Sequence, residues 1–273
     1  MLEHRMADEF RRDFEAATQI LSETKPFDIA PLQKAMAEYF FQFEPQVTNL
    51  YIKLATMISN SEWTGRIATL NYDRLLALSL ISQGIQPFCY PGNPSTQASI
   101  ELCLPHGCSY MFSPLIRTNN SAGTLAFLGL QVRFASGQPE TILDPSMFRH
   151  RIKSDDIPPV MSYFEPLKRT TTGGDFIRTQ RQRFSEIIEG AEKVAVVGIQ
   201  VRQRDEHIWE PLKQTNAEIL YCSGKDSGEE YKKWSSLARP AKKNKVLGGY
   251  FREEFDEILS FIGLQKFESR KEP

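Results

Sequence analysis

Apolar residues recur every three or four positions through the first sixty residues, with charged side chains between them. This spacing is typical of amphipathic helices. It predicts three helical stretches, over residues 6–24, 28–44 and 46–60, separated by Pro26 and Pro45. We therefore expect an N-terminal helical segment, residues 1–60, that precedes any strand and packs on the core of the domain that follows.

From residue 66 onward, short apolar runs alternate with amphipathic stretches. Strands are predicted at 66–70, 85–90, 101–104, 194–198 and 218–221, and a short extended segment at 158–165. Helices are predicted at 73–83, 176–190, 205–214, 226–237 and 250–263. The run from Val194 to Gly198 is continuously apolar, as is typical of a strand covered on both faces. The alternation predicts an α/β fold with a mostly parallel sheet and helices on both faces.

Turn-forming residues interrupt this alternation between residues 113 and 148. Ser-Pro, Asn-Asn and Ser-Gly-Gln-Pro sequences follow one another there, which favours loops and short elements on one face. We therefore predict an α/β domain over residues 61–265 with a small lobe inserted at about 113–148. Residues 266–273 are expected to form a charged tail.

The overall composition is that of an ordinary globular protein. The chain has 273 residues, of which 41% are hydrophobic and 25% charged. A net charge of −1 provides no field that would attract nucleic acid or an acidic membrane. No apolar run approaches the ~20 residues of a membrane helix, and the N-terminal residues contain no apolar signal core. We expect a cytoplasmic protein that binds neither nucleic acid nor membrane.

The four cysteines are Cys89, Cys103, Cys108 and Cys222, and no two of them form a C-x-x-C pair. A chain of this size with so few cysteines indicates reduced thiols rather than a disulfide framework. Cys103 and Cys108, with His106 between them, make only a weak zinc pattern because a second ligand pair is absent from the sequence. We expect no metal.

Polar residues follow two of the predicted strands, at the edge where open α/β sheets bind ligands. The first strand ends in Asn71-Tyr72-Asp73, and the strand at 101–104 leads into His106-Gly107. Asn71 offers an amide, Asp73 a carboxylate, and a neutral His106 can accept a proton from a hydroxyl group or water. Two structural alternatives stay open, because Asp73 can cap the following helix and a single histidine is usually structural.

Three segments, in this order, resemble the SIR2-like (sirtuin-related) family, in the branch found in bacterial defence proteins. Thr69-Leu70-Asn71-Tyr72-Asp73 is similar to its T-x-N-Y-D segment, and Leu104-Pro105-His106-Gly107-Cys108 to its H-G segment. Val196-Val197-Gly198, followed by Asp205-Glu206-His207, resembles its later strand, loop and helix. The segment from Pro158 to Lys168 is also similar, and the resemblance covers roughly residues 60–240.

The resemblance implies a Rossmann-like domain that binds NAD as its substrate and cleaves the nicotinamide–ribose bond. By this analogy Asn71 orients the ribose or an attacking water, His106 acts as the base, and Asp73 holds the nicotinamide carboxamide. The residues expected to line the rest of the NAD site are Thr69, Tyr72, Gly107, Gly198, Gln200 and Asp205, with Gly198 and Gln200 at the adenine-side ribose. Expected partners are NAD or an ADP-ribose-type nucleotide, further copies of this chain, or a protein of a defence system.

Two departures from the family pattern limit this expectation. The two C-x-x-C pairs of the zinc-containing deacetylases are missing, which favours NAD hydrolysis over protein deacetylation. The strand and Gly-Ala-Gly-x-Ser loop that cradle the pyrophosphate are also missing, so that either they lie before residue 1 or the cradle has been lost. A sheet without that strand would have an unpaired edge in its middle.

Three hypotheses follow from these observations. The first is an SIR2-like NAD+ hydrolase that acts as an effector of anti-phage defence. The second is a non-catalytic SIR2-like domain that binds a nucleotide or a protein partner. The third is an α/β domain unrelated to NAD, which would be favoured if Asn71 and His106 lay far apart.

Overall fold

The computed structural model describes residues 8–94, 98–118, 132–135, 137–155, 157–163, 170–202 and 204–264. The chain divides into two compact units, each assembled from three separate segments. The first unit consists of Met1–Glu44, Leu70–Arg74 and Leu104–Gln180, and the second of Pro45–Thr69, Leu75–Cys103 and Arg181–Pro273. The predicted tail, 266–273, and residues 119–131 of the predicted lobe lie outside the described residues.

The first unit begins with helix α2 (Phe14–Thr24), a 3-10 turn η1 (Pro26–Asp28) and helix α3 (Ile29–Phe41). The carboxylate of Asp13 accepts a hydrogen bond from the Ala16 amide at 3.0 Å and so caps α2. The ring of Phe41 stacks on Phe148 at a centroid distance of 3.7 Å. Residues at the end of α3 are thereby packed against a segment more than a hundred positions later in the chain.

The rest of the first unit contains short antiparallel pairs and one helix. Strand β4 (Met111–Phe112) pairs with β7 (Glu140–Thr141), and β5 (Leu115–Thr118) pairs with β6 (Val132–Ala135). Helix α7 (Pro145–Ser154) follows, capped by the Asp144 side chain. The sequence analysis missed α7 because only two of its residues, Phe148 and Ile152, are buried, which leaves almost no apolar periodicity. In the described part of the extended segment expected at 158–165, Met161 and Ser162 form isolated β-bridges with Gly107 and Thr170.

The second unit contains two three-stranded parallel sheets. In the first, β3 (Ser99–Cys103) lies between β1 (Ile67–Ala68) and β2 (Gln86–Phe88). Helices α4 (Leu50–Ser59) and α5 (Leu75–Ser82) accompany this sheet, and they contact each other. Strand β1 is shorter than predicted, since only Ile67 and Ala68 pair as a strand with β3.

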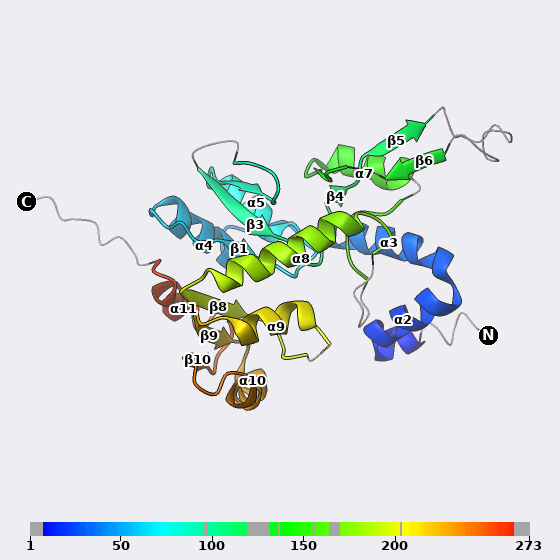
Figure 1. Cartoon of the computed structure of the whole chain (residues 1–273). Helices are drawn as coiled ribbons and strands as arrows, with labels where there is room; N and C mark the ends of the chain where they lie inside the picture. Colours follow the sequence, from blue (N-terminus) through cyan, green and yellow to red (C-terminus); the bar gives the residue numbers. More distant parts are fainter. Residues whose placement is uncertain are drawn as a thin grey trace, which may run out of the picture. The chain divides into compact units, whose positions relative to one another are not determined.

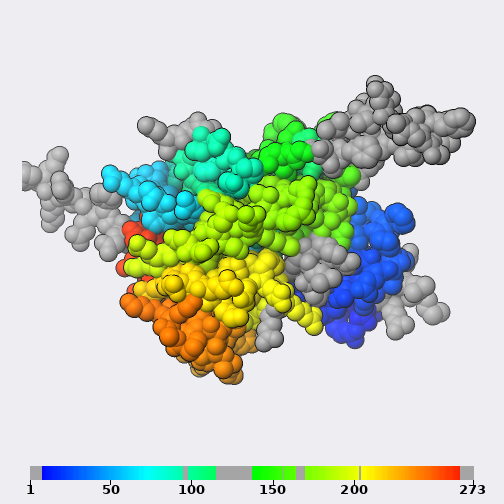
Figure 2. All heavy atoms as spheres, viewed as in Figure 1, coloured from blue at the N-terminus to red at the C-terminus, as the bar shows by residue number. Residues whose placement is uncertain are grey.

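The second parallel sheet has the order β10-β9-β8, with strands β8 (Lys193–Val197), β9 (Glu218–Cys222) and β10 (Asn244–Leu247) (Figure 1). Its helices are α9 (Glu206–Gln214), α10 (Lys225–Ala238) and α11 (Phe255–Phe261). Helix α10, seen in orange in Figure 2, carries an ion pair of 2.7 Å between the exposed side chains of Glu229 and Lys232. A buried cluster of Leu220, Cys222, Leu247 and Ile258 forms a core between β9, β10 and α11.

The part of helix α8 (Gly174–Glu189) that belongs to the second unit, from Arg181 on, is tied to β3 by an ion-pair network. Arg183 on α8 donates from Nε and Nη2 to the two oxygens of Glu101, at 2.6 and 2.9 Å. Arg66 adds a bond of 3.0 Å to the same carboxylate, which is only 8% exposed. Hydrogen bonding from Arg183, more than the smaller contribution of Arg66, lowers the pKa of Glu101 below its usual range despite its burial.

The prediction of an α/β fold containing parallel sheets is confirmed at this level. Strand β10 was not predicted, because Lys242, Lys243 and Lys245 give its sequence the appearance of a solvated loop. Among the described residues, no helix is both long and apolar enough to cross a membrane.

Candidate functional site

The first unit brings Asn71-Tyr72-Asp73 together with His106-Gly107. Tyr72 and His106 are 5% and 6% exposed, and their rings lie 6.4 Å apart with an angle of 25° between the planes. The backbone amide of Ser109 donates to the Tyr72 carbonyl oxygen at 2.9 Å. The two segments, more than thirty residues apart in sequence, are therefore joined by both a backbone hydrogen bond and a ring contact.

A third segment, Val160–Ser162, holds the loop around His106 on its other side. The Cys108 amide donates to the Val160 carbonyl at 2.9 Å, and the Ser162 amide donates to the His106 carbonyl at 2.8 Å. The Tyr72 hydroxyl donates to the Ser162 carbonyl at 3.2 Å. The sequence analysis missed this role, because backbone hydrogen bonds of this kind leave no residue pattern.

Gly107 adopts a backbone conformation that requires glycine. Its φ is +71°, in the left-handed region, and a Cβ atom there would lie 2.1 Å from the Val160 carbonyl oxygen. The close approach of Val160–Ser162 to the histidine loop therefore depends on the absence of a side chain at this position. The structure of this unit therefore requires the glycine of the His106-Gly107 pair.

The polar residues beside Tyr72 differ in their exposure. Asn71 is exposed and Asp73 half-buried. Because α5 begins at Leu75, Arg74 rather than Asp73 directly precedes the first helical residue. Arg74 is buried and donates to the carbonyl oxygens of Phe41 and Leu143, both at 2.9 Å, so its role is structural.

Ser109 is a further polar residue that the sequence analysis did not select. Its side chain is completely buried, and its hydroxyl has no hydrogen-bond partner among the described residues. An unsatisfied buried hydroxyl is costly, because it loses its hydrogen bonds to water without replacement. The signal that could have found it is its position, three residues after His106.

The other predicted ligand-binding residues belong to the second unit. Thr69 donates from its amide to the Cys103 carbonyl at 3.0 Å, which extends the β1–β3 ladder. Gly198 follows β8 with a φ of +73° and open space around its Cβ position, and Gln200 is exposed. The hydroxyl of Tyr221 donates to the Ile199 carbonyl at 2.5 Å and holds this loop at the carboxyl end of the sheet.

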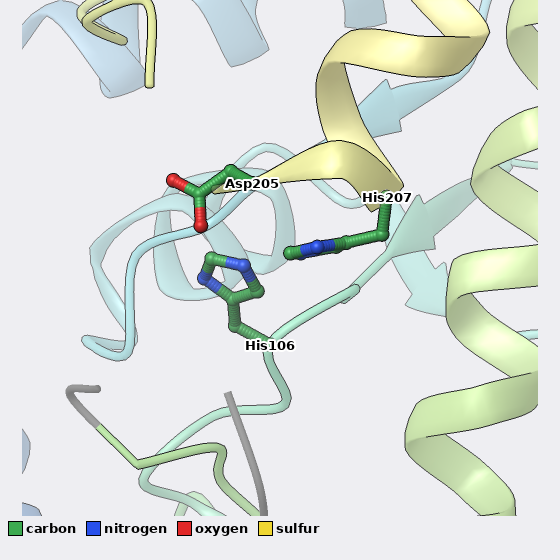
Figure 3. A group of neighbouring side chains, drawn as sticks. All are labelled: His106, Asp205 and His207. Atoms are coloured by element: carbon green, nitrogen blue, oxygen red, sulfur yellow. The ribbon is translucent and has the colours of Figure 1, made fainter. Parts of the chain in front are cut away.

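Asp205 and His207 lie at the beginning of α9, and His106 lies on the loop after β3 (Figure 3). Asp205 is 9% exposed, and its carbonyl accepts the amides of Ile208 and Trp209 at 2.9 and 3.0 Å. The ligand atoms of Asp205 and His207 lie within 4.8 Å of each other. Two such ligands within the second unit are fewer than the three protein ligands of a catalytic zinc site. The expectation of no metal stays a prediction.

Burial raises the pKa of two of the four cysteines. The four cysteines form no disulfide, and Cys103 and Cys108 are buried. Burial, with a smaller contribution from Glu101, raises the pKa of Cys89 to about 12. Burial likewise raises the pKa of Cys222 to about 11. Cys89 and Cys222 are therefore protonated at neutral pH, whereas metal binding requires the thiolate.

No family model, curated protein or solved structure matches this chain.

Proposed function

We propose that this chain is a cytoplasmic, SIR2-like NAD+ hydrolase with a Rossmann-like core, acting as an effector of anti-phage defence. The observation that carries the proposal is the contact between Tyr72 and His106, together with the bond from Ser109 to Tyr72. This contact places the Asn71-Tyr72-Asp73 and His106-Gly107 segments side by side, the arrangement that a shared ribose and nicotinamide site requires. The third hypothesis, an α/β domain unrelated to NAD, is correspondingly less favoured.

The proposed reaction breaks the bond between the nicotinamide nitrogen and the ribose C1′ atom and joins a water oxygen to C1′. NAD+ and water yield nicotinamide, ADP-ribose and one proton. Nicotinamide leaves as a neutral molecule, so the protein must mainly position the reactants and stabilise an oxocarbenium-like state. In this proposal exposed Asn71 orients the ribose or the water, Asp73 holds the carboxamide, and His106 accepts the proton.

The remaining predicted positions are proposed to hold the rest of the dinucleotide. Gly198 and Gln200 would line the adenine-side ribose, and Thr69, Tyr72, Gly107 and Asp205 are the other proposed NAD-binding residues. The open space around Gly198 and the exposure of Gln200 suit a backbone that a ribose can approach closely. This half of the proposal is testable separately, because changes there should weaken NAD binding more than they slow bond cleavage.

His106→Ala is the direct test of the hydrolase. Wild-type protein is expected to convert NAD+ to nicotinamide and ADP-ribose, and the variant to lose at least roughly a hundredfold in kcat, the usual contribution of a general base. Chromatographic separation of the two products measures the rate. The matched control is His150→Ala, since His150 is an exposed histidine on α7 and its removal should leave the rate unchanged.

The rate is measured both for the protein alone and after addition of phage-infected cell extract, which could supply an activating partner. The hydrolase proposal fails if wild-type protein turns over NAD+ no faster than His106→Ala under both conditions. In bacteria that express the chain, the defence role predicts a fall in cellular NAD after infection that His106→Ala abolishes. Infection without a change in NAD would leave the hydrolase proposal standing but remove the defence role.

A non-catalytic binding domain is the second candidate, and the burial of His106 favours it. The His106 side chain is only 6% exposed and stacks on Tyr72, as is typical of a core residue. Saturable thermal stabilisation by ADP-ribose or NAD, without product formation, is the expected result for this candidate, and efficient turnover excludes it.

A further inference from the structure

A buried glutamine of α3 joins two segments of the first unit that lie far from it in the sequence. Gln33 is only 2% exposed. Its Nε2 donates to the Met161 carbonyl oxygen at 2.7 Å, and its Oε1 accepts from the Thr171 hydroxyl at 2.6 Å. The same two segments share an isolated β-bridge between Ser162 and Thr170. The side-chain amide of Gln33 therefore cross-links them from α3.

The anchor that Gln33 provides reaches the histidine loop through the segment Val160–Ser162. Met161 lies opposite Gly107 in an antiparallel bridge. The backbone hydrogen bonds of this bridge come from the flanking residues, and one of them ends on the His106 carbonyl. In such a bridge the two opposed residues direct their own N–H and C=O groups away from each other. Gln33 therefore holds the segment on the side opposite to the histidine loop.

The histidine loop has little freedom to move independently of this segment. A Cβ atom at Gly107 would lie 2.1 Å from the Val160 carbonyl oxygen, so the two backbones are in close contact. The Tyr72 hydroxyl bonds to the Ser162 carbonyl at 3.2 Å, and the Tyr72 ring lies beside the His106 imidazole. A shift of the segment would therefore move both the loop and the tyrosine.

Helix α3 is itself fixed within this unit, further along from Gln33. Phe40 follows Gln33 by seven residues and so lies on the same helix face. Its ring centroid lies 5.9 Å from that of Tyr72. The next residue, Phe41, stacks on Phe148 at 3.7 Å. The helix is thus a firm support for the Gln33 side chain, and it contacts both segments of the candidate site.

We propose that Gln33 is a positioning residue of the candidate site: its side-chain amide fixes the Val160–Ser162 segment and, through it, the loop that carries His106. An amide suits this role because it supplies both a donor and an acceptor without adding a charge to a buried network. A buried polar network whose members are satisfied holds them in one arrangement. The effect on catalysis rests on the proposed hydrolase function, whereas the effect on the loop does not.

Gln33→Met tests the proposal in the full chain. Methionine has a similar length but offers neither the donor nor the acceptor of the amide. Residue-resolved amide exchange should become at least roughly tenfold faster at Cys108 and Ser162, whose amides form the bridge to the histidine loop, and stay unchanged at Phe148. The matched control is Gln19→Met, since the Gln19 side chain forms an exposed hydrogen bond within α2. It should change none of these rates.

Steady-state kinetics, expressed per folded molecule, provide a readout that a purely structural role would not move. Because Gln33 acts through His106, Gln33→Met should lower kcat roughly tenfold and leave the KM for NAD+ unchanged. A raised KM with an unchanged kcat would contradict the proposal, since it would mean that Gln33 supports NAD binding rather than the position of the base.

The exchange data decide the structural part by themselves. Unchanged exchange at Cys108 and Ser162 in Gln33→Met overturns the proposal, as does an equal acceleration at Phe148, which would show a general loosening of the unit. If Gln33→Met is unfolded by circular dichroism, Thr171→Val takes its place. It removes the donor to the Gln33 Oε1 atom from the exposed end, and it should accelerate the same two amides. Unchanged exchange in that variant overturns the proposal. Wild-type protein without NAD turnover removes the hydrolase proposal alone.

Discussion

At the scale of single residues, the candidate site depends on a glycine whose neighbours leave no room for a side chain. Gly107 combines a left-handed backbone with a Val160 carbonyl oxygen 2.1 Å from the position of its Cβ atom. Gly107→Ala should therefore lower the free energy of unfolding by about 3 kcal/mol or more, the sum of backbone strain and a backbone clash. Urea denaturation measures this change.

Gly84→Ala is the matched control for that substitution. Gly84 has a similar φ of +75°, but nothing lies within 4 Å of its Cβ position. Its substitution should cost only the backbone term, roughly 1–2 kcal/mol. Equal losses for the two variants would mean that the contact between Gly107 and Val160 contributes nothing.

At the scale of secondary-structure elements, α8 is held on β3 by the buried carboxylate of Glu101. Its pKa is lowered, chiefly by Arg183, so the stabilisation it provides is present above the unfolded pKa and is lost as the pH falls through the folded pKa. Glu101→Gln should cost roughly 2–3 kcal/mol at pH 7. The variant should also lose less stability than wild-type protein between about pH 5 and pH 2, as measured by thermal unfolding across that range.

Glu186→Gln provides the control on the same arginine. Glu186 also pairs with Arg183, at 2.9 Å, but its side chain is 43% exposed. An exposed ion pair contributes little, so this variant should change stability by less than about 0.5 kcal/mol. If the stabilities of Glu101→Gln and Glu186→Gln depend on pH in the same way, the burial of Glu101 does not cause the loss of stability in acid.

At the scale of the whole molecule, each compact unit is assembled from segments that are far apart in the sequence. In the first unit, the side-chain amide of Gln33 donates to the Met161 carbonyl at 2.7 Å, and Phe41 stacks on Phe148. A fragment comprising residues 45–273 should therefore lose amide-exchange protection at Phe148 and Ser162, whose amides donate to the carbonyls of Asp144 and His106. Hydrogen exchange measured by mass spectrometry tests this.

Strand β9 serves as the internal control for the fragment. It lies in the second unit and pairs with β8 and β10, all of which the fragment retains. Its amides should keep their protection if the fragment is folded there. Unchanged protection at Phe148 and Ser162 would show that residues 8–44 do not stabilise the first unit.

The sequence by itself determined the class of the fold and the identity of the polar residues near Tyr72 and His106. Apolar periodicity indicated α3, α9 and α10 and the strands β8 and β9, because local packing against one buried face imposes that periodicity. It could not indicate α7, with its two buried residues, or the lysine-flanked β10. Residue order alone also left open whether Asn71 and His106 were neighbours.

Only the tertiary structure decided which distant residues form hydrogen bonds and close contacts with each other. The bond from Ser109 to Tyr72 and the approach of Val160 to Gly107 both involve backbone groups. Every residue except proline carries the same backbone donor and acceptor, so the sequence contains no mark of where these bonds are made. The buried guanidinium of Arg239, which donates to the carbonyls of Thr215 and Ala217, is a further case, because arginine is usually exposed.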